Sequence, residues 1–362
     1  MDGPRAPKEN ELPKVLEFLN TNLRPNSNWS IASEYPTALS PSNIGNIRII
    51  TEGNTVLSHA VLKPLIIKTP AIVFKVGAIG SVVTDTQRRG QGLSQQILKE
   101  CLAEAERQEC DVALLWTNLY DFYRKLNFEL AAFEESIVLD KEFNANSSSL
   151  KFMQDTHVSA EAIHRLYNQH TVGSVRNVAD VRKFLSIPNT LLYTAWDAQG
   201  QLTAYAVEGK GADLNGYIHE WGGSVSNLLA LFSWIRKEKK TPFTIILGQH
   251  SLNLITALKA IPGATHNEGY LGMIKMTREK QLFGKIKRAA RSLGIADLVL
   301  EKIDEQYRLG VGTDVIEFTD EKDMVRAIFG PLPEIPNLKP ETMKTLEKVL
   351  PVNLWIWGWD SI

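Results

Sequence analysis

Apolar positions in the first 140 residues repeat first at helical and then at strand spacing. Between residues 9 and 23 they recur every three or four positions, which predicts a helix. Three β-branched runs follow, separated by Gly-Asn and Thr-Pro turn signals: NIRIITEG, TVLSHAVLKPLIIK and AIVFKVGAIGSVVT. Such runs joined by short turns predict an antiparallel meander.

Two helices and further strands complete this first part. The apolar stripe of residues 93–108 predicts a helix, and the apolar run at 112–116 predicts a buried strand. A second, short helix is expected at residues 119–126. Residues 128–139 then predict either two closing strands or one long strand.

The stretch FNANSSSLK, which follows Asp140, marks the expected domain boundary because Asn and Ser cluster there and apolar residues are few. Beyond it the order of elements approximately recurs. The chain is therefore divided into residues 1–140, 150–278 and 279–362. The second part is expected to contain helices at 160–169, 225–237 and 252–261 and strands at 191–196, 202–210, 216–221, 243–247 and 270–276.

The third region begins with a basic amphipathic segment, QLFGKIKRAARSLG, and ends in LPVNLWIWGWDSI. For the basic segment a solvated helix face is favoured over a surface for nucleic acid or membrane. Three of the eight tryptophans lie in this last stretch, so it is expected to be packed. The whole pattern predicts an α/β (α+β) fold with two mixed sheets flanked by helices and a small C-terminal α+β region.

Composition narrows the class of protein. A chain of 362 residues predicts two or three domains, and 40 Lys plus Arg against 41 Asp plus Glu leaves no global charge to attract nucleic acid or a membrane. Cys101, Cys110 and the histidines lack the spacing of a metal site or a disulfide framework. Because neither a signal peptide nor a long apolar run is found, we expect a soluble cytoplasmic protein without a metal.

Glycine and positive charge are concentrated where a predicted strand meets a predicted helix, in TDTQRRGQGLSQQILKE. A helix N-terminus presents unpaired N–H groups, and Gly90 and Gly92 would let an anion approach them closely. The stretch fits neither a Walker A loop nor a dinucleotide-binding turn. A pyrophosphate bound without Mg²⁺ is the better match, although such a helix start can also be a plain structural cap.

The stretch from Arg89 to Ser94 resembles the acyl-coenzyme A signature of the GNAT superfamily of N-acetyltransferases, Arg/Gln-x-x-Gly-x-Gly/Ala, with Ser94 as the final small residue. The overlapping register at 87–92 also fits the signature. The first register is preferred because Val82-Val83-Thr84 resembles the family's fourth strand. The motifs cover roughly residues 1–140, and for later parts the resemblance rests on the order of elements.

The stretch LYDFYRKLNF at residues 119–128 resembles a second signature of the family, Phe-Tyr-x-x-x-Gly-Phe, with Asn127 in place of the glycine. Asn tolerates the left-handed backbone better than most residues, so the helix is still expected to stop there. By this resemblance Tyr123 is the acid that protonates the departing thiolate. The alternative is a tyrosine that only packs against its own sheet.

The resemblance implies that acetyl-coenzyme A is the cofactor and lies between the fourth and fifth strands. Its pantetheine would pair with the fourth strand, and its pyrophosphate would meet the amides of the glycine-rich turn. The implied cofactor-binding residues are Val82, Val83, Thr84, Arg89, Gly90, Gln91, Gly92, Leu93 and Ser94.

The base is sought in the second part, in GYIHEWGG at residues 216–223. His219 and Glu220 point to opposite faces of the predicted strand, so one of them should face the interior or a cleft. Glu220 is flanked by Ile218 and Trp221, which would raise its pKa toward that of a base. An ordinary strand-end carboxylate is the alternative. The stretch lacks the basic residue and spacing of the cofactor signature, so the second part is not expected to bind coenzyme A.

The tandem arrangement resembles acetyltransferases of the enhanced-intracellular-survival type, in which the carboxylate of the C-terminus serves as the base. By that resemblance Ile362 is a further catalytic candidate. A sterol-carrier-like fold is one option for the third region, and homo-oligomerisation is left open.

These features predict an acetyl-coenzyme A-dependent N-acetyltransferase, whose acceptor amine attacks the thioester directly. The acceptor would be a small molecule or peptide carrying a primary amine, with aminoglycosides and protein lysines also open. The alternatives are a non-catalytic acyl-coenzyme A-binding or regulatory protein, and a transferase of a longer acyl or aminoacyl group.

Overall fold

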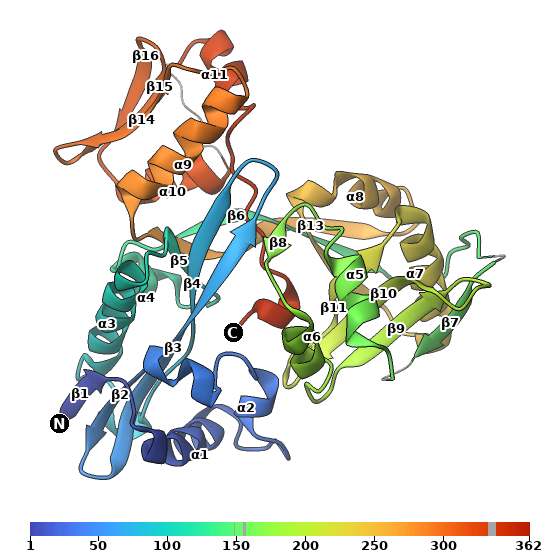
Figure 1. Ribbon diagram of the computed structural model, residues 1–362, viewed down its shortest axis with the longest axis horizontal. Helices are drawn as coiled ribbons and strands as arrows, with labels where there is room; N and C mark the ends of the chain where they lie inside the picture. Colours follow the sequence, from blue (N-terminus) through green and yellow to red (C-terminus); the bar gives the residue numbers. More distant parts are fainter. Residues whose placement is uncertain (148, 155–156, 332–337) are drawn as a thin grey trace.

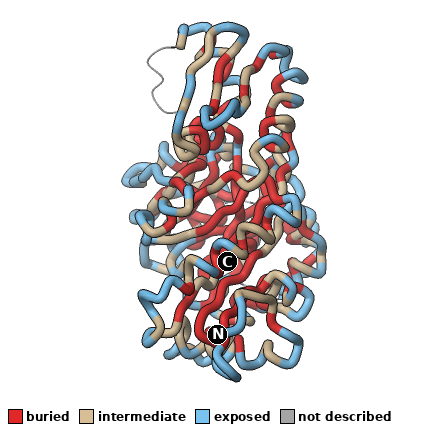
Figure 2. The backbone as a smooth tube through the Cα atoms, turned by 90° about the vertical axis from the view of Figure 1, so that its left-hand side faces the viewer, coloured by how far each residue is buried: buried red, intermediate tan, exposed pale blue. Residues whose placement is uncertain are grey.

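A long mixed sheet runs through the molecule, and a small antiparallel sheet lies in the C-terminal region (Figure 1). The computed structural model describes residues 1–362 except for 148, 155–156 and 332–337. The strand order of the long sheet is β1-β2-β3-β4-β5-β13-β6-β12-β11-β10-β9-β7, and β8 pairs with β3. Buried residues follow the strands in the middle of the molecule, as Figure 2 shows. Among the described residues, no helix combines the length and apolarity needed to span a membrane.

The first part matches the predicted helices and meander closely. Its elements are β1 (Asp2–Arg5), η1 (Glu9–Glu11), α1 (Leu12–Leu23), α2 (Ile31–Glu34), η2 (Pro41–Asn46), β2 (Ile47–Glu52), β3 (Thr55–Lys68), β4 (Val73–Thr84), η3 (Thr86–Arg88), α3 (Leu93–Arg107), β5 (Val112–Leu115), α4 (Tyr120–Arg124) and β6 (Glu129–Leu139). Residues 128–139 therefore form one long strand rather than two. The short elements β1 and α2 were not expected from the sequence.

The second part contains every helix and strand that was predicted for it. Its elements are β7 (Lys151–Gln154), α5 (Ala160–Tyr167), β8 (Gly173–Ser174), α6 (Val178–Phe184), β9 (Leu191–Trp196), β10 (Leu202–Lys210), β11 (Asp213–Gly223), α7 (Val225–Lys239), β12 (Phe243–Gly248), η4 (Gln249–Ser251), α8 (Leu252–Lys259) and β13 (Thr265–Met276). The elements β7, β8 and α6 are additions, and they are short enough to carry little periodic signal.

The last strand of each half is inserted into the sheet of the other half. β13 lies between β5 and β6, with Met273 opposite Leu115, and β6 lies between β13 and β12, with Ile137 opposite Ile245. The two sheets that the sequence predicted therefore form one continuous sheet, in which strands from before and after residue 140 pair with each other. Local apolar patterns predict a strand but not its partner, so the sequence did not indicate this exchange.

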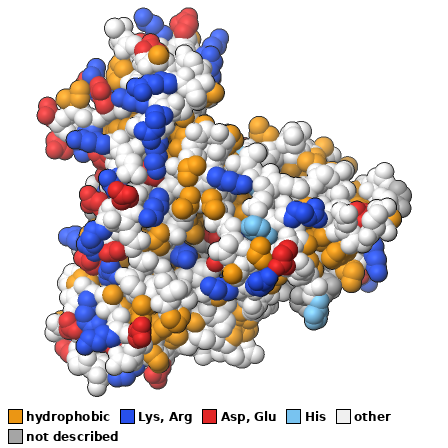
Figure 3. Space-filling view, viewed as in Figure 1, with side chains coloured by type: hydrophobic (Ala, Val, Ile, Leu, Met, Phe, Trp, Pro, Cys, Tyr) orange, Lys and Arg blue, Asp and Glu red, His pale blue; other side chains and the backbone are white. Residues whose placement is uncertain are grey.

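The C-terminal region packs helices on a three-stranded sheet. Its elements are α9 (Glu279–Ser292), β14 (Leu298–Ile303), β15 (Gln306–Val311), β16 (Asp314–Phe318), α10 (Glu321–Phe329), α11 (Pro340–Leu346) and η5 (Gly358–Asp360). The apolar face of α9 is buried, whereas Arg288 and Arg291 are exposed. Lys and Arg side chains gather over this region in Figure 3. The terminal segment, residues 355–362, leaves the region and ends between the two halves (Figure 1).

Candidate active site

β4 and β5 pair over a short stretch and then separate. Val76, Gly77 and Ala78 pair in parallel with β5, whereas β4 continues to Thr84. The register of β4 with β3 shifts in this continuation, and Ser81 adopts a left-handed backbone with φ of 50°. A bulge of this kind bends a strand and leaves backbone groups unpaired. The separated part of β4 can therefore accept an extended ligand along its edge.

The glycine-rich turn leaves the start of α3 open. Gly90 and Gly92 have φ of 79° and 75°, and a Cβ built on either would meet nothing within 4 Å. Gly92 is the residue before the helix, and no side chain caps the first turn of α3. The N–H groups of that turn are thus available to an anion, which the helix dipole also favours.

The two arginines of the turn differ in their surroundings. Arg88 is paired with Glu52, whereas Arg89 is exposed and has no partner among the described residues. Within the turn Gln91 is also exposed, and the side chain of Leu93 is buried in the core. A free guanidinium at Arg89 agrees with the register that begins there.

Three hydroxyl groups connect β3, β4 and α3. Thr84 Oγ1 lies 2.8 Å from Ser58 Oγ and 2.7 Å from Ser94 Oγ. Val82 lines a cavity described below, and Val83 packs in the core under α1. The end of β4 and the first turn of α3 are therefore held together at the place where the sequence predicted the cofactor.

Tyr123 is buried on α4, with 6% of its surface exposed. Its ring packs edge-on against Phe122 and Phe128, with centroids 5.0 and 6.0 Å away. Burial raises the pKa of Tyr123 to about 12, and its hydroxyl makes no hydrogen bond with a described residue. At neutral pH the phenol keeps its proton and could donate it. Asn127 adopts φ of 62°, so the left-handed stop predicted for α4 is confirmed.

A cavity of about 580 Å³ lies beside the separated strands. Its walls come from all three parts of the chain. Residues that line it include Val82 and Trp116 from the first part, Tyr217 and Tyr270 from the second, and Trp355 and Ile362 from the terminal segment. Tyr123 and Glu220 are not among the lining residues.

Ile362 lies against β4 at the start of the bulge. A Cβ built on Gly80 would come within 2.6 Å of the carboxyl carbon of Ile362, so only glycine leaves room for this group. The predicted catalytic candidate Ile362 therefore stands where β4 leaves β5, and it also lines the cavity.

The corresponding strands of the second half, β11 and β12, also separate after a short parallel pairing, which involves Tyr217 and Ile218 of β11. The terminal segment fills this second opening. A Cβ on Gly358 would lie 2.1 Å from His219 of β11, and the ring of Trp357 packs edge-on against Trp221 at 4.9 Å. Residues of the terminal segment therefore occupy the space beside β11 where the strands separate.

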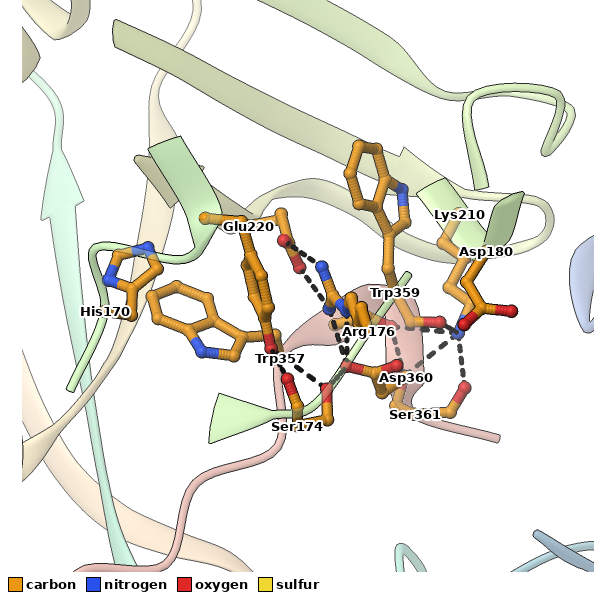
Figure 4. Close-up of polar contacts among 12 residues, drawn as sticks. His170, Ser174, Arg176, Asp180, Lys210, Glu220, Trp357, Trp359, Asp360 and Ser361 are labelled. Carbon is orange, nitrogen blue, oxygen red and sulfur yellow. Dashed lines mark hydrogen bonds and ion pairs between the residues drawn. The ribbon is translucent and has the colours of Figure 1, made fainter. Parts of the chain in front are cut away.

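A buried ion-pair network fixes the terminal segment to the second half (Figure 4). Arg176 donates from Nη1 to Glu220 and from Nη2 to Asp360, both at 2.6 Å. Ser174 also donates to Asp360, and Tyr205 donates to Glu220 at 3.2 Å. The three charged side chains are at most 5% exposed. Charges buried this deeply persist only when paired, so each holds the others in place.

Lys210 holds the same segment through its main chain. Its Nζ donates to the carbonyl oxygens of Gly358 at 2.9 Å and Trp359 at 3.3 Å, and also to that of Ser361. Burial lowers the pKa of Lys210 to about 7. The last residues of the segment are thus fixed by hydrogen bonds immediately before Ile362.

The predicted base Glu220 is fully buried in this network. Burial raises its pKa, as its apolar neighbours in the sequence indicated, while the guanidinium of Arg176 acts in the opposite direction. His219, on the other face of β11, is equally buried. Glu220 contacts Arg176 and Tyr205 rather than the cavity, and no sequence pattern indicated Arg176 as its partner.

Glu134 is a cavity residue that sequence reasoning missed. It lies on β6, is half-buried and lines the cavity. Burial raises the pKa of Glu134 to about 7. In the sequence Glu134 is only one of two adjacent glutamates in a predicted strand. Which of the two faces the cavity is decided by the pairing of β6 with β12 and β13, which the sequence did not indicate.

Residues 4–131 match the model of a family described as an acetyltransferase (GNAT) domain. No curated protein matches the chain. The match covers the strands, the turn and the helix described above, and it supports acyl transfer in general.

Solved structures share the fold of this chain at low identity, two of them over nearly its whole length and a third over 75% of it. A GCN5-related N-acetyltransferase from Anabaena variabilis is 15% identical, with 99% of each chain covered and a TM-score of 0.68. A conserved protein of unknown function from Enterococcus faecalis, described as a probable N-acyltransferase, is 13% identical over 98% of this chain and 97% of its own, with a TM-score of 0.63. Eis1 from Mycobacterium abscessus is 11% identical, with 75% of this chain and 73% of its own covered and a TM-score of 0.50.

Proposed function

The N-terminal part of this chain belongs to the GNAT acetyltransferases, and from that premise we propose that the protein transfers an acetyl group from acetyl-coenzyme A to a primary amine. The observation that carries the proposal is the junction of β4 and α3. There a separated strand edge, an uncapped helix start and the exposed Arg89 follow one another along the chain. These groups suit a pantetheine arm followed by a pyrophosphate.

In this proposal the backbone of Val82 and Thr84 pairs with the pantetheine. The amides of residues 89–94 bind the pyrophosphate, with Arg89 adding charge. The open space above Gly90 and Gly92 supports this arrangement, because a side chain there would stand between the amides and the phosphates.

The chemistry is a direct attack on the thioester. The ammonium of the acceptor first loses a proton to the carboxylate of Ile362. The neutral amine then forms a bond to the carbonyl carbon, the carbon–sulfur bond breaks, and the thiolate takes a proton from the Tyr123 hydroxyl. The nitrogen of the new amide releases its extra proton to solvent and the tyrosinate takes one up, which restores Tyr123. The contact of this carboxyl group with Gly80, at the separation of the strands, supports Ile362 in that role.

For Glu220 the contacts favour positioning over proton transfer. It holds Arg176, which in turn holds Asp360, two residues before Ile362. We therefore assign Glu220 to keeping the terminal segment in place.

The test is release of coenzyme A thiol from acetyl-coenzyme A with a panel of acceptors: alkyl amines, an aminoglycoside, a peptide with a free amino terminus and a lysine-containing peptide. Turnover with any of them supports the proposal. Binding of coenzyme A without turnover on the whole panel would instead support a binding or regulatory protein. Acyl-coenzyme A esters of increasing length, tested in parallel, decide whether acetyl is the preferred group.

A further inference from the structure

Glu134 lies between two glycines in the sheet. On β6 it stands directly opposite Gly248 of β12 and Gly269 of β13. Directly opposed residues of antiparallel strands point to the same face, so no neighbouring side chain of those two strands flanks the carboxylate. A Cβ on Gly269 would meet nothing closer than 3.9 Å, whereas the space above Gly248 is occupied by the rings of His250 and Trp355. Burial lowers the pKa of His250 to about 4, so this ring is neutral at neutral pH. The carboxylate thus has an open side and a side lined by two uncharged rings.

The charge of Glu134 is not neutralised within the described part of the chain. Arg24 is the one cation among the described residues that line the cavity, and it is paired with Glu34 at 2.8 Å and Asp213 at 3.1 Å. The adjacent Glu135 points to the other face of β6 and pairs with Lys259. A half-buried carboxylate without a partner is costly to keep ionised, which agrees with its pKa of about 7.

The walls near this carboxylate suit an apolar body that carries a cation. Tyr217 and Tyr270 line the cavity and are 43% and 44% exposed, so their rings are accessible to a ligand. Trp116 and Trp355 add further aromatic surface. Aromatic faces attract ammonium groups as well as apolar chains.

We infer that the cavity accepts amines that carry a second cationic group, and that Glu134 binds this second group while the first amine is acetylated. This inference rests on the proposed function. Glu134 and the carboxyl group of Ile362 have no cationic partner among the described residues that line the cavity. In this arrangement Ile362 faces the reacting amine and Glu134 faces the distant one. The substrate class is a diamine or polyamine whose amines are separated by an apolar spacer.

The experiment compares octylamine with α,ω-diaminooctane as acceptors of the full chain, in the thiol-release assay. The variants are Glu134→Gln and, as the matched control on the opposite face of the same strand, Glu135→Gln. We expect the wild-type protein to have a KM for the diamine that is roughly 10-fold or more below that for the monoamine, because a hydrogen bond to a charged group carries a difference of that size. Glu134→Gln should remove this preference by raising the KM of the diamine, whereas Glu135→Gln should retain it.

Binding of the diamine, measured by calorimetry without acetyl-coenzyme A, separates the two proposals. If no amine is acetylated but the diamine binds the wild-type protein and not Glu134→Gln, the proposed function fails and the subsite stands. If both amines are acetylated with equal KM and Glu134→Gln changes neither, the subsite is wrong and the function stands. A loss of kcat that is equal for both acceptors, at unchanged KM, would place Glu134 in proton transfer and would also overturn the subsite.

Discussion

At the scale of single residues, Tyr123 combines a buried ring with a hydroxyl that has no partner among the described residues. Replacing it by Phe preserves the packing against Phe122 and Phe128. We expect Tyr123→Phe to lower kcat by about 10²-fold or more, since general-acid catalysis contributes that much, with little change in the KM for acetyl-coenzyme A. Tyr120→Phe, an exposed tyrosine on the same helix, is the control. Equal kinetics of the two variants would remove Tyr123 from the mechanism.

Glu134 allows a prediction about stability. Its pKa in the folded protein, about 7, is above the ordinary carboxyl value, so the folded state binds a proton that the unfolded state has already lost. Stability contributed by this group is therefore present at low pH and is lost as pH rises toward and through 7. Glu134→Gln should raise the Tm relative to wild type at about pH 8 and lose that advantage at about pH 5.

The matched control for this prediction is Glu135→Gln, which removes a carboxylate that is paired with Lys259. It should show no such gain at the higher pH. If the Tm of Glu134→Gln equals that of wild type at both pH values, burial does not destabilise the ionised form of this carboxylate.

At the scale of elements, the terminal segment depends on the pair between Arg176 and Asp360. Asp360→Asn keeps the shape of the side chain but removes its charge, and should lower kcat because Ile362 is no longer held against Gly80. The Tm should also fall, since breaking a buried pair costs about 3–5 kcal/mol. The control is Glu161→Gln, which breaks the exposed pair with Arg182 and should change neither quantity measurably. A fall in Tm with kcat unchanged would reduce the pair to a purely structural role.

The sequence predicted those elements that carry their own periodic signal. The helix at 93–108 and the strands at 55–68 and 202–210 were located well because amphipathic spacing and turn residues are local properties. The left-handed Asn127 was predicted for the same reason. The exchange of β6 and β13 was not, because pairing partners are chosen by tertiary packing.

The site divides in the same way. The open turn around Gly90 and Gly92 could be read from the chain, since glycine and charge at a strand-to-helix junction have a local physical meaning. Glu134 and Arg176 could not, because their roles come from neighbours that are distant in sequence. Glu220 illustrates both kinds of feature. Its burial was predicted from the apolar residues beside it in the sequence, whereas its pairing with Arg176 was not predicted.

At the scale of the whole molecule, the terminal segment links three parts of the chain. It leaves the C-terminal region, fills the opening between β11 and β12, and brings Ile362 to β4. A short peptide tag added after Ile362 should lower kcat by about 10²-fold or more, because it removes the carboxylate from the site. The same tag before Met1 should leave kcat and KM near wild type. Equal activity of the two tagged proteins would exclude the Ile362 carboxylate as the base.

We propose that one opening of the long sheet, between β4 and β5, holds the acetyl donor, while the terminal segment fills the other, between β11 and β12. A crystal structure of the full chain with coenzyme A tests it most directly. We expect the pantetheine along residues 82–84 and the pyrophosphate at the start of α3, with Trp357 still in place between β11 and β12. Coenzyme A bound in the second opening with Trp357 displaced, or bound away from residues 82–94, would contradict the claim.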